Sequence, residues 1–161
     1  MVDRLTRAQR SRNMARIRGA HTVPERTLRS ALHRMGLRFR LHQADLPGRP
    51  DIVLRRFRTA IFVHGCFWHR HRGCSYAATP KTRAKFWQKK LNGNRGRDSR
   101  QIRSLVEMGW RVLVVWECAL RNEGGQAVAA SVTEWIRGES PFSEIASTAT
   151  RYRTEGRRKP P

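Results

Sequence analysis

The sequence predicts a single α/β domain with a mixed central sheet flanked by helices. Two β-rich runs, DIVLR and TAIFVHG, stand close enough together to form an antiparallel pair. A long basic helical segment then leads into RVLVVWEC, the most convincing buried strand of the chain, which favours a crossover connection. At 161 residues and 39% apolar content, the chain is long enough for one core of ordinary size.

The first predicted element is a helix over residues 23–35, which Thr22 can cap and Gly36 can end. Apolar residues three to four positions apart form its predicted buried face: Leu28, Ala31, Leu32 and Met35. The alternating run LRFRL predicts a half-buried strand, and LPGRP predicts a turn.

The second half begins with the antiparallel pair. TRAKFWQKKLNGNRGRDSRQIRSLVEMG predicts one long helix, or two that join near residues 92–96, ahead of RVLVVWEC. A last helix is predicted over residues 127–137. We therefore expect a basic arm at residues 1–20, a folded domain at 21–140 and a flexible basic tail at 141–161.

The charge balance is strongly basic, with 34 Lys and Arg residues against 12 acidic ones, a formal net charge of +22. A surface of one sign favours a polyanionic partner, and nucleic acid is the first candidate. The alternative is a compositional bias toward arginine, which accounts for 29 of the 34 basic residues. No apolar run predicts a membrane span or a secretory signal, so we expect an intracellular protein.

The three cysteines and one histidine have the spacing of a metal site. Cys66, His71 and Cys74 form C-x4-H-x2-C, and Cys118 at the end of RVLVVWEC can supply a fourth ligand. Three thiolates and one imidazole make a closed tetrahedral zinc site, which is typical of structural zinc. The alternative is that the cysteines are small buried apolar residues and His71 lies at the surface.

A carboxylate at the start of a strand is the next candidate. The segment PGRPD ends in Asp51, and twelve residues later the partner strand reaches Val63 and His64. Nucleases of the PD-(D/E)xK type present a carboxylate in this way to hold Mg²⁺ against the scissile phosphate, although the usual second acidic residue is missing here. The alternative is a turn aspartate that caps a strand.

Four segments together closely resemble the very-short-patch repair endonucleases, the Vsr family: LPGRPD, IFVHGCFWHRH, FWQKKLNGNRGRD and GWRVLVVWECAL. The resemblance covers about residues 7–137. It implies a restriction-endonuclease-like, PD-(D/E)xK-type fold with a structural zinc and catalytic Mg²⁺. It also implies an enzyme that nicks one DNA strand next to a T:G mismatch, the product of 5-methylcytosine deamination.

The resemblance assigns catalytic roles to five residues. Asp51 would bind Mg²⁺ directly, and Val63 would contribute its backbone carbonyl in place of the threonine typical of the family. His69 matches the histidine that activates water, while His64 and Glu25 match residues that hold metal-bound waters and phosphate. Imidazole and carboxylate groups suit these tasks, although a lone histidine is more often a core or surface residue.

The resemblance also assigns residues that contact the DNA. It implies an intercalating wedge of four side chains: Phe67, Trp68, Trp87 and Met14. Lys90 and Asn94 match residues that read the T:G wobble pair. Without the resemblance, Trp87 would be read as a core residue and Met14 as a residue without a specific role. Lys90 and Asn94 would be read as part of a solvated helix face.

The zinc loop departs from the family by one extra residue, since Arg72 and Gly73 both separate His71 from Cys74. We keep all four ligands, because a glycine makes the longer loop easy to close.

We therefore expect a monomeric, Mg²⁺-dependent DNA endonuclease of the bacterial cytoplasm that nicks 5′ of the thymine in a T:G mismatch. Mismatch-repair proteins and a cytosine methyltransferase are partners by analogy alone. One alternative is a related nickase or restriction-type endonuclease with another target. The other is a non-catalytic, zinc-containing DNA-binding module.

Overall fold

The computed structural model describes residue 6, residues 8–9, residue 12 and residues 19–147. Its elements run in this order: α2 (Val23–Arg34), β1 (Arg40–Leu41), β2 (Ile52–Leu54), η1 (Arg55–Phe57), β3 (Thr59–His64), η2 (Ser75–Ala77), α3 (Ala84–Glu107), β4 (Arg111–Trp116), α4 (Glu117–Asn122), α5 (Gly124–Arg137) and β5 (Phe142–Ile145). The predicted arm lies almost wholly outside the described residues. No helix among those described is long and apolar enough to span a bilayer.

The sheet has five strands in the order β1-β2-β3-β4-β5. Strands β1, β2 and β3 pair antiparallel, whereas β3, β4 and β5 run parallel. Both central expectations are confirmed, namely the antiparallel β2–β3 pair and the parallel pair that α3 connects. The sheet is therefore mixed, and β3 is the strand where its direction of pairing changes.

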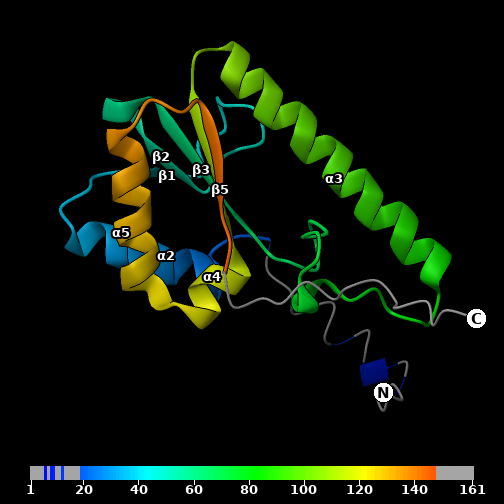
Figure 1. Ribbon diagram of the computed structural model, residues 1–161. Coiled ribbons are helices and arrows are strands. Elements are labelled where there is room, and N and C mark those ends of the chain that lie inside the picture. The colour runs from blue at the N-terminus through cyan, green and yellow to red at the C-terminus, as the bar shows by residue number, and fades with distance from the viewer. Residues whose placement is uncertain (1–5, 7, 10–11, 13–18, 148–161) are drawn as a thin grey trace, which may run out of the picture.

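Helices cover both faces of the sheet, because the strands alternate their apolar side chains. Helices α2, α4 and α5 lie on one side and α3 lies on the other (Figure 1). On the first side, Ile52, Ile61 and Leu113 pack in one cluster with the buried residues of α2 and α5. Their neighbours Val53 and Phe62 point the other way, into a cluster with Leu105 of α3. This period of two fixes the register of each strand against its neighbours.

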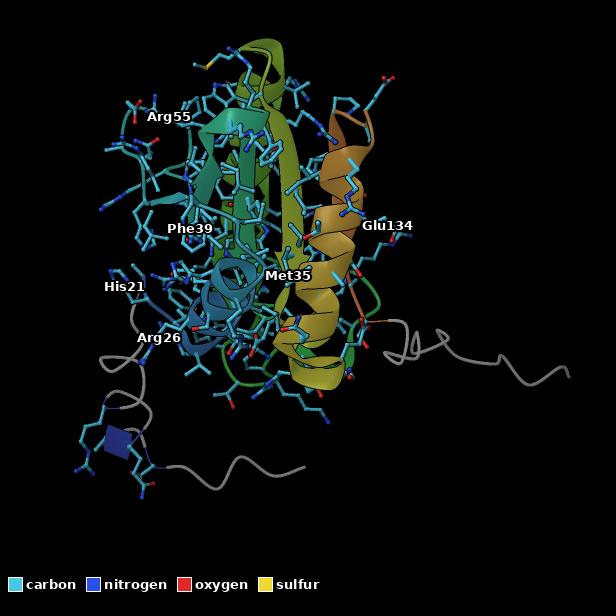
Figure 2. All side chains as sticks on the ribbon, turned by 90° about the vertical axis from the view of Figure 1, so that its left-hand side faces the viewer. His21, Arg26, Met35, Phe39, Arg55 and Glu134 are labelled. Atoms are coloured by element: carbon cyan, nitrogen blue, oxygen red, sulfur yellow. The ribbon has the colours of Figure 1, made fainter. Side chains whose placement is uncertain are left out.

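Helix α2 begins as the sequence predicts. Thr22 forms a capping box with Glu25, in which each side chain accepts a hydrogen bond from the other residue's N–H. Three of the four predicted core residues are fully buried, but Met35 is 37% exposed. Met35 lies just beyond the end of α2 and faces α5, where Thr133 Oγ1 lies 3.8 Å from its sulfur (Figure 2).

The segment 84–107 forms one uninterrupted helix, α3, which is the first of the two predicted alternatives. The prediction that residues 141–161 form a flexible tail is wrong at its start, because Phe142–Ile145 form β5 and pair with β4. Strand β5 extends the sheet and brings Glu144 beside the end of β4. Residues 148–161 lie outside the described part of the chain.

Candidate active site

The candidate site lies where three strands bring their ends together. Asp51 immediately precedes β2, and because β2 is antiparallel to β3, Asp51 lies beside the carboxyl end of β3. Strand β4 is parallel to β3, so its carboxyl end also reaches this edge of the sheet. Arg55 marks the opposite end of β2, far from His21 and Arg26 near the start of α2 (Figure 2).

A cleft of about 630 Å³ opens at this edge. Its lining includes side chains from α2, from the loops around β2 and β3, and from α3: Glu25, His42, Asp51, His64, Trp68, His69, Asn94 and Asp98. One cavity therefore joins the residues predicted to cleave DNA with two of those predicted to contact the mispaired base.

Asp51 is held against β3 by the Val63 N–H, which donates to Asp51 Oδ2 over 2.8 Å. Burial, together with the nearby carboxylate of Glu25, raises the pKa of Asp51 to about 6. The charges of His69 and Arg29 offset this shift only in part, and a bound cation would offset it further. The structure joins Val63 to Asp51 through the amide, and the role of the Val63 carbonyl as a metal ligand stays a prediction.

Glu25 is buried at the start of α2 and is engaged by several donors. Its Oε2 accepts from the His21 N–H (2.9 Å) and pairs with Arg29 Nη2 (3.0 Å). Its carboxylate therefore faces both the helix start and the cleft. The ring of His42 lies between Glu25 and Asp51, 3.6 Å from Glu25 Oε2 and 3.7 Å from Asp51 Oδ1.

The two predicted histidines stack on each other at the end of β3. The rings of His64 and His69 lie 3.8 Å apart and 6° from parallel. Burial, and then the neighbouring His69, lower the pKa of His64 to about 3, so that ring is neutral at physiological pH.

On its other side, His69 Nδ1 donates to Asp98 Oδ2 of α3 over 2.6 Å. Burial alone would raise the pKa of Asp98, but the hydrogen bond and charge of His69 bring it below its usual range. This contact fixes the orientation of the His69 ring and the nitrogen that carries its proton. The other nitrogen, Nε2, is left to act as a base.

Two residues of the site, Asp98 and His42, are not predicted from the sequence. Asp98 ends the motif FWQKKLNGNRGRD, and it follows Asn94 by four residues on α3. That spacing places the two side chains on one helix face, which is the signal that could have found Asp98. His42 lies in a loop, and nothing in the local sequence pattern indicates that it meets Glu25 and Asp51.

The four predicted zinc ligands come together beside the cleft. Their donor atoms lie within 4.8 Å of one another: Cys66, His71, Cys74 and Cys118. Cys66 Sγ and Cys118 Sγ each lie 3.5 Å from His71 Nδ1. Burial raises the pKa of the Cys66 and Cys74 thiols, so thiolates here would require a metal ion to stabilise them. The donor set is that of a tetrahedral zinc site.

This cluster is connected to β4 and, through it, to β5. The ring of His71 stacks on Trp116 at the end of β4, with centroids 4.1 Å apart. Trp116 Nε1 in turn donates to Glu144 Oε2 of β5 over 2.8 Å. The unexpected strand β5 therefore supports the loop that carries the predicted ligands.

The predicted aromatic wedge forms one cluster at the mouth of the site. Ring centroids of Phe67 and Trp68 lie 5.0 Å apart, and that of Trp87 lies 5.5 Å from Phe67. Phe86, which the sequence did not predict for this cluster, adds a fourth ring that is 46% exposed and 5.4 Å from Trp87. The fourth predicted wedge residue, Met14, lies outside the described residues.

Helix α3 docks onto the loop through three consecutive loop residues. Asn94 Nδ2 donates to the Trp68 carbonyl (3.2 Å), and Arg70 donates to Asn92 Oδ1 (2.6 Å). The third contact is the hydrogen bond from His69, the residue between Trp68 and Arg70, to Asp98. The Lys90 ammonium lies over the rings of Trp68 and Trp87, 5.6 and 5.7 Å from their centroids. The two predicted base-reading residues therefore border the aromatic cluster.

Known proteins have similar sequences. The sequence model described as DNA mismatch endonuclease Vsr matches residues 2–75. The DNA mismatch endonuclease Vsr of Escherichia coli is 46% identical over 148 residues, which cover 90% of this chain and 94% of that protein. The type II nicking enzyme V.XorIIP of Xanthomonas oryzae pv. oryzae is 49% identical over 124 residues, 77% of this chain and 90% of its own length. V.NaeI of Lentzea aerocolonigenes, also a type II nicking enzyme, is 43% identical over 145 residues, 86% of this chain and 84% of its own length.

Proposed function

The chain belongs to the Vsr family of DNA mismatch endonucleases, and from this membership we propose that it nicks one strand of duplex DNA 5′ of the thymine in a T:G mismatch. The nick would initiate very-short-patch repair of deaminated 5-methylcytosine. Relatives named as nicking enzymes support cleavage of a single strand.

The observation that carries this proposal is the shared cleft. A mismatch nickase must distinguish a base pair and break a phosphodiester bond beside it. The cleft is lined by Asp51 and the His69–Asp98 pair, which suit hydrolysis, and also by Trp68 and Asn94, which suit contact with a base. A nuclease without mismatch selectivity would not require the second group.

The hydrolytic step follows from the histidine pair. Asp98 holds the proton of His69 on Nδ1, so Nε2 is free to take a proton from the attacking water. His64 stays neutral at physiological pH, so it places no second positive charge against His69 when that ring is protonated. The stack of the two rings further limits rotation of His69.

Divalent-cation binding suits the other side of the cleft. Asp51 is a partly buried carboxylate whose pKa stays raised despite the nearby charges of His69 and Arg29, which fits a cation. Asp51 would hold Mg²⁺ with the Val63 carbonyl, while Glu25 and His64 would hold its waters and the phosphate. Mg²⁺ bound there would stabilise the negative charge that develops on the phosphate and the leaving oxygen.

Zinc fits the Cys₃His cluster, where four residues would fill all tetrahedral positions and leave none for water. We assign it a structural role. Its ligands would fix both ends of the loop that carries Phe67, Trp68 and His69.

The aromatic cluster supplies the wedge. Phe67, Trp68 and Trp87 are only partly buried, so their rings are available to insert between base steps, which is easiest at a mismatch. Met14 would enter from the opposite groove. Lys90 and Asn94 would read the shifted carbonyls of the wobble pair.

The wider assignments follow the same family. The mixed sheet with Asp51 at a strand start supports a PD-(D/E)xK-type nuclease fold. We expect the enzyme to act as a monomer on DNA in the bacterial cytoplasm. Mismatch-repair proteins and a cytosine methyltransferase are partners by analogy.

The test is a strand-specific nicking assay on otherwise identical T:G, U:G and fully paired duplexes, at one salt concentration and with added Mg²⁺. We expect cleavage 5′ of the mispaired thymine and little cleavage of the paired duplex. Asp51→Ala should abolish cleavage and keep DNA binding. Equal cleavage of paired and T:G duplexes would refute the repair assignment.

A nickase for another target is the second candidate, because several relatives are named as type II nicking enzymes. The same duplexes with every flanking base randomised would reveal such a target. Binding without any Mg²⁺-dependent cleavage would instead indicate a non-catalytic DNA-binding module.

A further inference from the structure

His42 occupies an unusual position that the proposed mechanism does not use. Its side chain is only 10% exposed and lies between two carboxylates, those of Glu25 and Asp51. One nitrogen of the ring, Nε2, faces Glu25, and the other, Nδ1, faces Asp51 Oδ1. Among the described residues, His42 is the only group that the structure pairs with Asp51 Oδ1, since Oδ2 accepts from the Val63 N–H.

Hydrogen bonds alone do not explain this arrangement. The distances of 3.6 and 3.7 Å exceed the range of about 2.7–3.2 Å for such bonds. Nε2 is buried and has no hydrogen-bond partner among the described residues. Neither ring nitrogen therefore has a direct hydrogen bond to the carboxylate that it faces, which is a costly state for a side chain only 10% exposed.

A cation between His42 and Asp51 resolves this conflict. Two ligands at about 2.1 Å from one ion, at octahedral or tetrahedral angles, lie about 3.0–3.4 Å apart, close to the observed 3.7 Å between Nδ1 and Oδ1. The proton would then stay on Nε2 and face Glu25. Histidine ligands usually direct their second nitrogen at a carboxylate in this way, which orients the ring.

We propose that His42 is a direct ligand of the cation site at Asp51, and that it makes this site prefer a first-row transition ion such as Mn²⁺ over Mg²⁺. The proposal deepens the proposed function, because it concerns the same cation site. An imidazole nitrogen suits transition ions, whereas Mg²⁺ prefers oxygen ligands and retains its waters. Glu25 would orient His42 as well as cap α2.

Mn²⁺ binding to the full, zinc-loaded chain without DNA tests the proposal. Free Mn²⁺ is counted by EPR to give the dissociation constant, and pulsed EPR detects a directly bound imidazole nitrogen. We expect a nitrogen signal in the wild type. His42→Gln should lose that signal and weaken Mn²⁺ binding by at least about tenfold. The affinity for Mg²⁺, measured by competition with Mn²⁺, should fall by a smaller factor in the same variant.

His33→Gln is the matched control, because His33 is an exposed residue of α2. It should keep both the nitrogen signal and the affinity, and circular dichroism and zinc content should show that both variants are folded. A wild type without the nitrogen signal would overturn the proposal, as would a signal that survives His42→Gln. Loss of the signal in His64→Gln but not in His42→Gln would place the ion at the other histidine cluster and also overturn it.

These readouts do not depend on DNA cleavage. If the mismatch assay fails while His42→Gln loses the nitrogen signal, the target of the enzyme is wrong and the ligand assignment stands. If T:G duplexes are nicked and the signal is unaffected by His42→Gln, the function stands and the ligand assignment is wrong.

Discussion

Replacement of Asp98 by asparagine tests the central chemical claim, that Asp98 acts through His69. The bond between Nδ1 and Oδ2 is 2.6 Å long, and the two side chains are 25% and 13% exposed. A charge-assisted hydrogen bond of this kind contributes about 1.5–3 kcal/mol. At about 1.36 kcal/mol per tenfold change, its loss would slow cleavage by about 10-fold to about 150-fold. The amide can also donate to Nδ1, which would put the ring proton on Nε2 and remove the base.

The assay is the single-turnover rate of nicking on a T:G duplex with enzyme in excess, so that binding does not limit the rate. His69→Gln should lose the full contribution of a general base, about 10²-fold to 10⁴-fold. The double variant should be no slower than His69→Gln alone, because both changes act on one imidazole. Asp45→Asn is the control, since Asp45 is an exposed carboxylate paired with Arg55. Losses that multiply in the double variant would show that Asp98 acts independently of His69.

Three further predictions concern the metal sites and the wedge. The wild type should contain one tightly bound zinc by elemental analysis, and Cys118→Ser should lose it together with much of the folding stability; a stable, zinc-free wild type would exclude the site. Trp68→Ala should lower the ratio of affinities for T:G and paired duplexes by about 5-fold to about 150-fold at fixed salt, the equivalent of about 1–3 kcal/mol of stacking. An unchanged ratio would mean that the wedge is assigned wrongly. Since the pKa of Asp51 is raised to about 6, its carboxyl group holds a proton below that pH and must release it to bind a cation. Mn²⁺ affinity should therefore be constant above about pH 6 and fall about tenfold per pH unit below it, and isotherms in which the fall begins only near pH 4 would contradict the raised pKa.

The sequence predicts those parts of the fold whose signals are local. The Thr22 cap of α2, the alternating apolar strands and the long helix before β4 each depend on residues a few positions apart. Strand β5 has no such signal, because its residues are exposed or only partly buried and it forms by pairing with β4. The short helix α4 was missed because it follows β4 without a break and is only six residues long.

The same distinction applies to the site. The Cys₃His cluster could be predicted because three of its members lie within nine residues and the fourth, Cys118, closely follows the strongest strand. Asp98 and His42 depend on contacts between distant segments, since Asp98 meets a histidine 29 positions away. The fold brings such pairs together, and neither periodicity nor spacing in one segment specifies them. Only the resemblance to a family assigned roles to isolated residues such as His69.

Under the proposed function, helix α3 couples recognition of the mismatch to cleavage. Trp87, Lys90, Asn94 and Asp98 follow one another at intervals of three or four residues, so their side chains project from one face of the helix. At 1.5 Å per residue, this face spans about 16 Å from Trp87 to Asp98. The loop that carries Trp68 and His69 is bonded to the same face. Under the proposed function, the distance from mismatch to nick is therefore set by the length of a rigid helix, and a wedge that fails to insert would leave His69 away from the scissile phosphate.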